Sequence, residues 1–159
     1  MLKRIVAGGQ TGVDRGALSA ALGAGVEAGG WCPKGRRAED GTIPDKYPMQ
    51  EMTSPDYADR TKANVKASDA TLILSRDTEL EGGTKLTRRF AVQLDKPFLQ
   101  AKLGGGLVEE ARAVADWVMR EGVDVLNVAG PRESKEPGIQ GEAEEFVAVL
   151  IDELAERGR

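Results

Sequence analysis

Residues 7–18 read AGGQTGVDRGAL and follow directly on the apolar run LKRIVA at 2–7. The apolar run has the character of a buried strand, whereas the positions after the glycines repeat apolar residues at helical spacing over 13–23. A strand that turns through glycines straight into a helix is the first half of a βαβ unit. The opening of the chain therefore predicts a parallel sheet.

The same alternation continues along the chain, apart from the irregular stretch 29–48, which we expect to be a long loop. Further strands are expected at 49–52, 70–75, 97–101 and 124–130, and further helices at 56–69, 84–94, 107–121 and 138–157. Repeated strand–helix units require right-handed crossovers and a sheet with helices on both faces. We predict a single α/β domain over 1–159, a Rossmann-like three-layer sandwich with a mainly parallel sheet.

Composition limits the chemistry. The 159 residues carry a formal net charge of −4, no histidine and one cysteine, Cys32. Without histidine, neither a Ser-His nor a Cys-His nucleophile can be built, and a zinc site has an improbable ligand set. We therefore expect no metal site and no catalytic residue of these types.

Charge and hydropathy also limit the partners. An acidic chain lacks the basic footprint of a duplex-binding protein. No apolar stretch approaches the ~20 residues that cross a bilayer, and the N-terminus lacks a signal-peptide pattern. We expect no nucleic-acid partner, no membrane partner and a cytoplasmic location.

Three glycine-bearing loops come after expected strands: GGQTG at 8–12, RDTELEGGT at 76–84 and GPRESKEPG at 130–138. The carboxyl ends of parallel strands lie at one edge of the sheet, where ligands of open α/β sheets bind. The three loops should therefore face one crevice.

The first loop suits an anion, because glycines let main-chain N–H groups approach closely and the following helix directs its dipole at the same point. We expect the N–H groups of residues 9–12 and the Thr11 hydroxyl to hold a phosphate. Thr11 and Asp14 equally fit a capping box, which would be a purely structural role. The loop has no Walker lysine and lacks the first glycine of a dinucleotide fingerprint, so neither of those sites is expected.

The other two loops repeat the chemistry. Gly82, Gly83 and Thr84 stand at a helix start, where they would bind an anion or simply form a helix cap. Arg132 can grip an oxyanion with two parallel N–H bonds, although a solvated arginine is equally consistent with the sequence. Taken together, the loops predict an anionic small-molecule ligand.

Five segments together resemble one family: GGQTGVDRGAL, GGWCPKGRRAEDG, SDATLIL, EGGT and LNVAGPRES. They look like the molybdenum cofactor carrier proteins, Rossmann-like relatives of the cytokinin-activating, lysine decarboxylase-like proteins. The resemblance implies a homo-oligomer, a dimer or tetramer, that binds molybdenum cofactor (molybdopterin) or a related phosphate-bearing nucleotide. The resemblance and the loop chemistry together indicate these binding residues: Gly8, Gly9, Gln10, Thr11, Gly12, Asp14, Gly82, Gly83, Thr84, Gly130, Arg132 and Ser134.

The chain departs from the nucleotide-cleaving relatives. Their phosphate loop reads Pro-Gly-Gly-x-Gly-Thr-x-x-Glu and ends in a catalytic glutamate, whereas this chain has Thr87 three residues after Thr84. We therefore favour a non-catalytic carrier. Two alternatives stay open: a nucleoside 5′-monophosphate phosphoribohydrolase in which Glu81 or Asp14 substitutes for the glutamate, and a nucleotide-sensing module.

Overall fold

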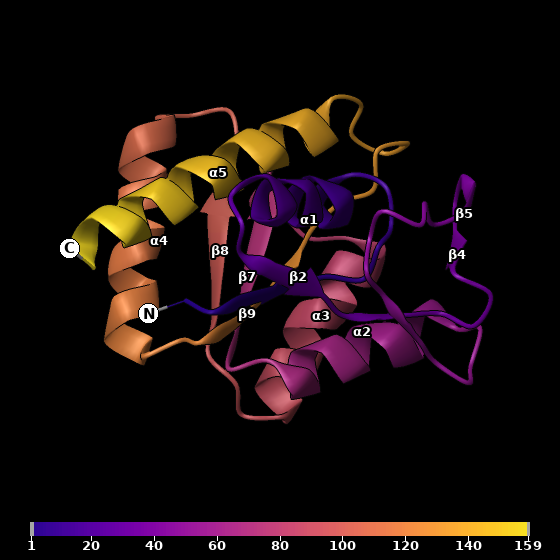
Figure 1. The fold of residues 1–159 in the computed structure, drawn as a ribbon. Coiled ribbons are helices and arrows are strands. Elements are labelled where there is room, and N and C mark those ends of the chain that lie inside the picture. Colours follow the sequence, from indigo (N-terminus) through magenta and orange to yellow (C-terminus); the bar gives the residue numbers. More distant parts are fainter. Residues whose placement is uncertain (1, 159) are drawn as a thin grey trace.

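The computed structural model describes residues 2–158 and contains a five-stranded central sheet (Figure 1). Its strands are β1 (Arg4–Val6), β2 (Glu27–Gly29), β7 (Ala70–Ser75), β8 (Phe98–Lys102) and β9 (Val125–Ala129). They are all parallel and lie in the order β2-β1-β9-β7-β8. The predicted Rossmann-like α/β fold with a mainly parallel sheet is confirmed.

Helices cover both faces of the sheet. One face carries α1 (Val13–Gly23), α4 (Leu107–Glu121) and α5 (Ile139–Arg157), and the other carries α2 (Tyr57–Ala67) and α3 (Gly82–Gln93) (Figure 1). Right-handed crossovers explain this division, because connections that run in opposite directions along the sheet place their helices on opposite faces. All six residues of β7 are buried, as its apolar sequence ATLILS predicts for a strand between two helical layers.

The sheet has the Rossmann strand order, but the chain begins at a different strand. Counted from β9 and then through β1, β2, β7 and β8, the order reads 3-2-1-4-5, which is the Rossmann order. The strand that would come first in that scheme is here the last. The topological switch point, where ligands bind in such sheets, therefore lies between β9 and β7.

The stretch expected to be one long loop contains short strands instead. β3 (Trp31–Cys32) pairs with β6 (Gln50–Glu51), which lies within the strand expected at 49–52, and β4 (Arg37–Ala38) pairs with β5 (Gly41–Thr42). The prediction also missed β2, the edge strand just before this stretch. The strands β2, β3, β4 and β5 have two or three residues each and are too short to show a period-2 pattern, which is why they were not predicted. Residues 37–42 form the β4–β5 arm, which reaches back towards the first glycine loop.

Among the described residues, no helix is long and apolar enough to cross a membrane.

Candidate functional site

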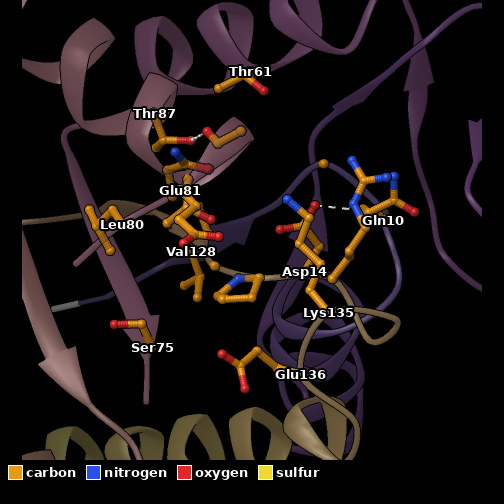
Figure 2. Close-up of a pocket in the computed structure, with 18 of the residues that line it drawn as sticks. Gln10, Asp14, Thr61, Ser75, Leu80, Glu81, Thr87, Val128, Lys135 and Glu136 are labelled. Carbon is orange, nitrogen blue, oxygen red and sulfur yellow. Dashed lines mark hydrogen bonds between the residues drawn. The ribbon is translucent and has the colours of Figure 1, made fainter. Parts of the chain in front are cut away.

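A cavity of about 700 Å³ opens at the carboxyl ends of β7 and β9, at the switch point of the sheet (Figure 2). Its walls come from the loop after β1, from α2, from the loop after β7 with the start of α3, and from the loop after β9. The volume lies within the range of small-molecule sites. The three glycine loops thus meet at one crevice, as their positions after parallel strands suggested.

The cavity takes in part of the predicted residue set. Seven of the predicted residues line it: Gly8, Gln10, Asp14, Gly83, Thr84, Gly130 and Arg132. The other five belong to the same loops but are not among its lining residues: Gly9, Thr11, Gly12, Gly82 and Ser134. Ligand binding by any of the twelve remains a prediction.

A buried ion pair forms the floor of the cavity beside the first loop. Asp14 and Arg60 are only 8% and 7% exposed, and Arg60 Nη1 lies 3.8 Å from Asp14 Oδ2. Arg60 also donates to the carbonyl of Gly8 at 2.6 Å. Burial raises the pKa of Asp14 to about 6, against the opposing effects of Arg60 and of main-chain hydrogen bonds. Arg60 was not predicted, since nothing in the polar pattern of its helix distinguishes it from a solvated arginine.

Gln10 presents an unsatisfied donor. Its Oε1 accepts the main-chain N–H groups of Thr11 at 3.1 Å and Glu39 at 2.9 Å. These two bonds fix the orientation of the amide, because a flipped amide would set its NH2 group against two N–H donors. Gln10 Nε2 is then buried with no hydrogen-bond partner among the described residues. A buried donor without a partner costs about 1–3 kcal/mol, so an acceptor atom on a ligand would be favoured here.

The start of α3 is open to the cavity. Glu81 is the N-cap residue, and its carbonyl accepts the N–H groups of Thr84 at 3.1 Å and Lys85 at 3.3 Å. The N–H groups of Gly82 and Gly83 have no acceptor in the part of the chain that the structure describes. Lys135 approaches from the loop after β9, since a Cβ added at Gly82 would lie 3.3 Å from its Nζ. Free N–H groups at a helix N-terminus beside an ammonium group form a favourable place for an anion.

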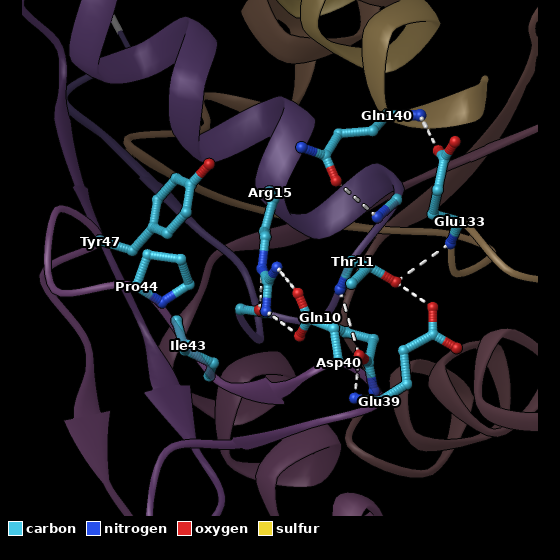
Figure 3. Close-up of polar contacts among 12 residues, drawn as sticks. Gln10, Thr11, Arg15, Glu39, Asp40, Ile43, Pro44, Tyr47, Glu133 and Gln140 are labelled. Atoms are coloured by element: carbon cyan, nitrogen blue, oxygen red, sulfur yellow. Dashed lines mark hydrogen bonds and ion pairs between the residues drawn. The ribbon is translucent and has the colours of Figure 1, made fainter. Parts of the chain in front are cut away.

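The first loop is different, because three of its N–H groups are already used. The N–H of Gln10 donates to Asp14 Oδ2 at 3.2 Å, and those of Thr11 and Gly12 donate to the side chains of Gln10 and Gln140, the latter at 3.0 Å (Figure 3). The expectation that the N–H groups of residues 9–12 hold a phosphate finds no support in the contacts of these three, and only the N–H of Gly9 has no acceptor among residues 2–158.

The predicted capping box is wrong. The N-cap of α1 is Gly12, with φ +85° and no side-chain cap, and Asp14 accepts from Gln10 instead of reaching back to Thr11. A Cβ at Gly12 would lie 2.3 Å from the carbonyl oxygen of Pro131, so this glycine is required by the close approach of two loops.

An unpredicted carboxylate, Glu39 of the β4–β5 arm, lies where an anion was expected. The Thr11 hydroxyl donates to Glu39, and Ser134 donates both its hydroxyl and its main-chain N–H. Arg132 Nη1 lies 3.9 Å from Glu39 Oε1. These four residues, Thr11, Glu39, Arg132 and Ser134, form the Glu39 cluster. The segment at 38–40 (AED) could not predict this role of Glu39, because the role depends on how the β4–β5 arm folds back.

Three guanidinium groups surround one aromatic ring near the cavity. The carbon Cζ lies 4.5 Å from the Tyr57 ring centroid for Arg37, 5.3 Å for Arg60 and 5.5 Å for Arg132. Arg60 is balanced by Asp14 and Arg132 faces Glu39, whereas Arg37 has no carboxylate partner among the described residues. The positive charge is local to this ring, because the cavity lining as a whole has more acidic than basic side chains: Asp14, Asp77, Glu79, Glu81 and Glu136 against Arg60, Arg132 and Lys135.

No group of acidic or cysteine side chains in residues 2–158 could hold a metal ion.

Fold and cavity together define a class: Rossmann-like domains with a ligand cavity at the switch point of a parallel sheet. The chain belongs to the circularly permutated YpsA SLOG family, whose model matches residues 5–151. The strand order, Rossmann-like when counted from β9, agrees with a circular permutation.

A solved structure from Syntrophus aciditrophicus is similar over nearly the whole chain. It is 42% identical, covers 96% of this chain and 94% of its own, and has a TM-score of 0.86. It is named a "putative molybdenum carrier protein". No curated protein matches the sequence. The family resemblance stated from the sequence motifs is confirmed.

Proposed function

We propose that the protein is a non-catalytic carrier that binds a phosphate-bearing pterin, molybdenum cofactor, or a related nucleotide in the 700 Å³ cavity. One observation carries the proposal: the unpartnered N–H groups of Gly82 and Gly83 lie at the start of α3, whose first turn lines the cavity. The name of the Syntrophus structure supports the same class of cargo.

The phosphate would lie at the α3 N-terminus. The N–H groups of Gly82 and Gly83 would donate to its oxygens, and Thr84 and Lys135 would add a hydroxyl and a positive charge. Arg132, which lines the cavity from the loop after β9, would complete the neutralisation of a dianion.

The heterocycle would lie towards the loop after β1. Gln10 Nε2 is a buried donor that needs an acceptor, and Asp14 is a buried acceptor close to it. A ring that carries both a carbonyl or ring nitrogen and an N–H group, as pterins and purines do, would satisfy both residues. Among residues 2–158, no cysteine or methionine lines the cavity, so we propose that molybdenum would be held through the organic part of the cargo.

A specific observation also favours hydrolysis as a second candidate. Asp14 lines the cavity, and its pKa of about 6 would allow it to give a proton to a leaving base near neutral pH. Thr87, at the position of the relatives' glutamate, donates its hydroxyl to the carbonyl of Gly83. In this candidate Asp14 would protonate the leaving base while water adds to the sugar carbon C1′, and incubation with AMP or GMP would release the free base and ribose 5-phosphate.

The decisive experiment is native mass spectrometry, with molybdenum analysis, of protein purified from a host that makes molybdenum cofactor. We expect a pterin-sized adduct in the wild type and its loss in Arg132→Gln. Arg112→Gln is the matched control, because this exposed arginine of α4 pairs with Glu153 and does not line the cavity.

The outcomes separate the candidates. An adduct of nucleotide size without metal would turn the proposal towards a nucleotide carrier or sensor, and release of base from AMP would favour the hydrolase. Absence of any adduct, together with no binding of added AMP, GMP or molybdopterin, would contradict the proposal. Homo-oligomerisation and a cytoplasmic location remain predictions, and sedimentation would test the first.

A further inference from the structure

The Glu39 cluster has the composition of an oxyanion site. A hydroxyl from Thr11, a hydroxyl and a main-chain N–H from Ser134, and the guanidinium of Arg132 all face one carboxylate. These donors come from the loops after β1 and β9. Thr11 is only 7% exposed, so part of the donor set is built into the protein and not supplied by mobile surface groups.

The carboxylate that fills this site is held as an anion. Burial opposes ionisation of Glu39, but hydrogen bonds from Ser134 and Thr11, with Arg132 nearby, outweigh it and leave its pKa below the ordinary value. The donors thus stabilise negative charge, which is the property that a site for phosphate requires.

The element that carries Glu39 lies outside the central sheet, although Ala38 is buried in the core and Arg37 donates to the carbonyl of Pro55 at 3.1 Å. The β4–β5 arm pairs only with itself, two residues on two. It is joined to the first loop by the Glu39 side chain, by the N–H of Glu39 on Gln10 Oε1, and by the paired hydrogen bonds of Arg15 with Asp40 at 2.6 and 2.8 Å. Withdrawal of the Glu39 side chain breaks no contact of the central sheet.

Arg132 connects this cluster to the cavity, because it lines the cavity and also lies 3.9 Å from Glu39. We propose that Thr11, Arg132 and Ser134 form a second oxyanion subsite at the edge of the cavity, which Glu39 closes and which takes a phosphate group when the Glu39 side chain withdraws. The inference deepens the proposed function and rests on it in one respect, the use of Arg132 by a phosphate-bearing cargo.

A built-in anion lowers the apparent affinity of the subsite, because only the fraction of molecules with Glu39 withdrawn can bind. In exchange, the buried donors are never left without an acceptor when the cargo is absent. The arm would thereby act as an intramolecular competitor that an incoming phosphate must displace.

The test compares wild type with Glu39→Gln, using inorganic phosphate, AMP and adenosine as probes in calorimetric titrations. The glutamine keeps an acceptor for Ser134 but removes the competing charge. We expect at least a tenfold gain in affinity for inorganic phosphate and for AMP, and none for adenosine. A gain for AMP without one for inorganic phosphate would overturn the inference, because an oxyanion subsite of Thr11, Arg132 and Ser134 must also take the free ion. Asp45→Asn removes the same charge from an exposed position after the arm and should leave all affinities unchanged.

Adding Thr11→Val to Glu39→Gln should cancel the gain, since the valine has the same shape without the hydroxyl. An amide chemical shift in the wild type supplies a measurement that no variant can confound: 50 mM phosphate should shift the resonance of the Ser134 N–H, which donates to Glu39 Oε2 at 3.3 Å and would donate to the phosphate instead. Equal phosphate and AMP affinities in wild type and Glu39→Gln, or an unchanged Ser134 resonance, would overturn the inference.

The two proposals fail in different ways. If AMP, GMP and molybdopterin bind the wild type and Arg132→Gln weakens them, but Glu39→Gln brings no gain for phosphate, the subsite is wrong and the carrier stands. If Glu39→Gln gains affinity for inorganic phosphate and for AMP alike, while adenosine and molybdopterin bind neither protein, the subsite stands and the carrier is wrong.

Discussion

Two glycine loops of this molecule look alike in sequence and differ in what their backbones do. GGQTG after β1 and EGGT after β7 both place glycines and a threonine at a helix start. In the first loop, the N–H groups of Gln10, Thr11 and Gly12 all donate to acceptors of the chain itself. In the second loop, those of Gly82 and Gly83 donate to nothing in residues 2–158.

The comparison separates two reasons for a glycine in such a loop. Gly12 is required because another loop passes against it, whereas a Cβ at Gly83 would meet no atom within 4 Å. A glycine-rich turn after a strand therefore indicates that something comes close to the backbone. Whether that is the protein's own chain or a ligand depends on contacts from distant segments.

The largest expected effect concerns the loop after β1, at Gly12. Gly12→Ala should reduce the free energy of unfolding by about 3–5 kcal/mol, because the new Cβ meets the Pro131 carbonyl at 2.3 Å and the positive φ is strained for alanine. Chemical denaturation measures the loss. Gly23→Ala, at the far end of α1 with open space around it, is the control and should not destabilise. A loss below about 1 kcal/mol for Gly12→Ala would mean that the loop is not closely packed.

Asp14 contacts both the loop after β1 and the cavity. Its carboxylate accepts the N–H of Gln10, and its side chain lines the cavity. Its folded pKa of about 6 lies above the ordinary value of 3.8, so the folded state favours the protonated acid. The resulting stabilisation is fully present below pH 3.8 and is lost as the pH rises through 6, a change of about 3 kcal/mol.

The measurement subtracts the unfolding free energy of Asp14→Asn, which cannot titrate, from that of the wild type at each pH. The difference should fall by about 3 kcal/mol between about pH 4 and pH 7. A difference that does not depend on pH would show that the pKa of Asp14 is not raised in the folded protein. It would also remove the basis for the hydrolase candidate.

A smaller effect on stability is expected in the loop after β9, which lies between the loops after β1 and β7. Glu133 accepts the N–H groups of Gly138 at 2.6 Å and Gln140 at 3.0 Å, and these bonds lower its pKa. Glu133→Ala should cost about 1 kcal/mol, as loss of a helix cap does. The cost should be present above pH 4.5, the ordinary pKa, and should vanish as the pH falls through the lowered folded value. Glu144→Ala, on the exposed side of α5, should change stability by less than half of this amount.

The smallest effect is expected at Gly83, in the loop after β7. Gly83→Ala should raise the free energy of unfolding by about 0.5–1 kcal/mol, because the alanine restricts the unfolded chain and meets nothing in the folded one. The main-chain N–H is retained, so AMP affinity should change little. A destabilisation similar to that of Gly12→Ala would contradict the distinction between the two loops.

Features set by local pattern could be predicted from the sequence. The long apolar and amphipathic segments indicated the sheet, the helices and the meeting of three loops at one edge. Glu39, Gln140 and Arg60 could not be predicted, because each acts on the first loop from 28 or more residues away. The capping box failed for the same reason, since the distant Glu39 competes successfully for the Thr11 hydroxyl.

The position of β9 has a consequence for how the protein is made. β1 pairs with β2, β7 pairs with β8, and among the described strands β9 joins the two pairs. When residues 1–120 have emerged from the ribosome, the nascent chain can form only the separate pairs β1–β2 and β7–β8. Neither two-stranded pair is stable alone in water. The sheet can close only when the last strand emerges. We expect pulse proteolysis of stalled nascent chains to show protection abruptly, once Ala129 and α5 have left the exit tunnel, and not in steps along the chain.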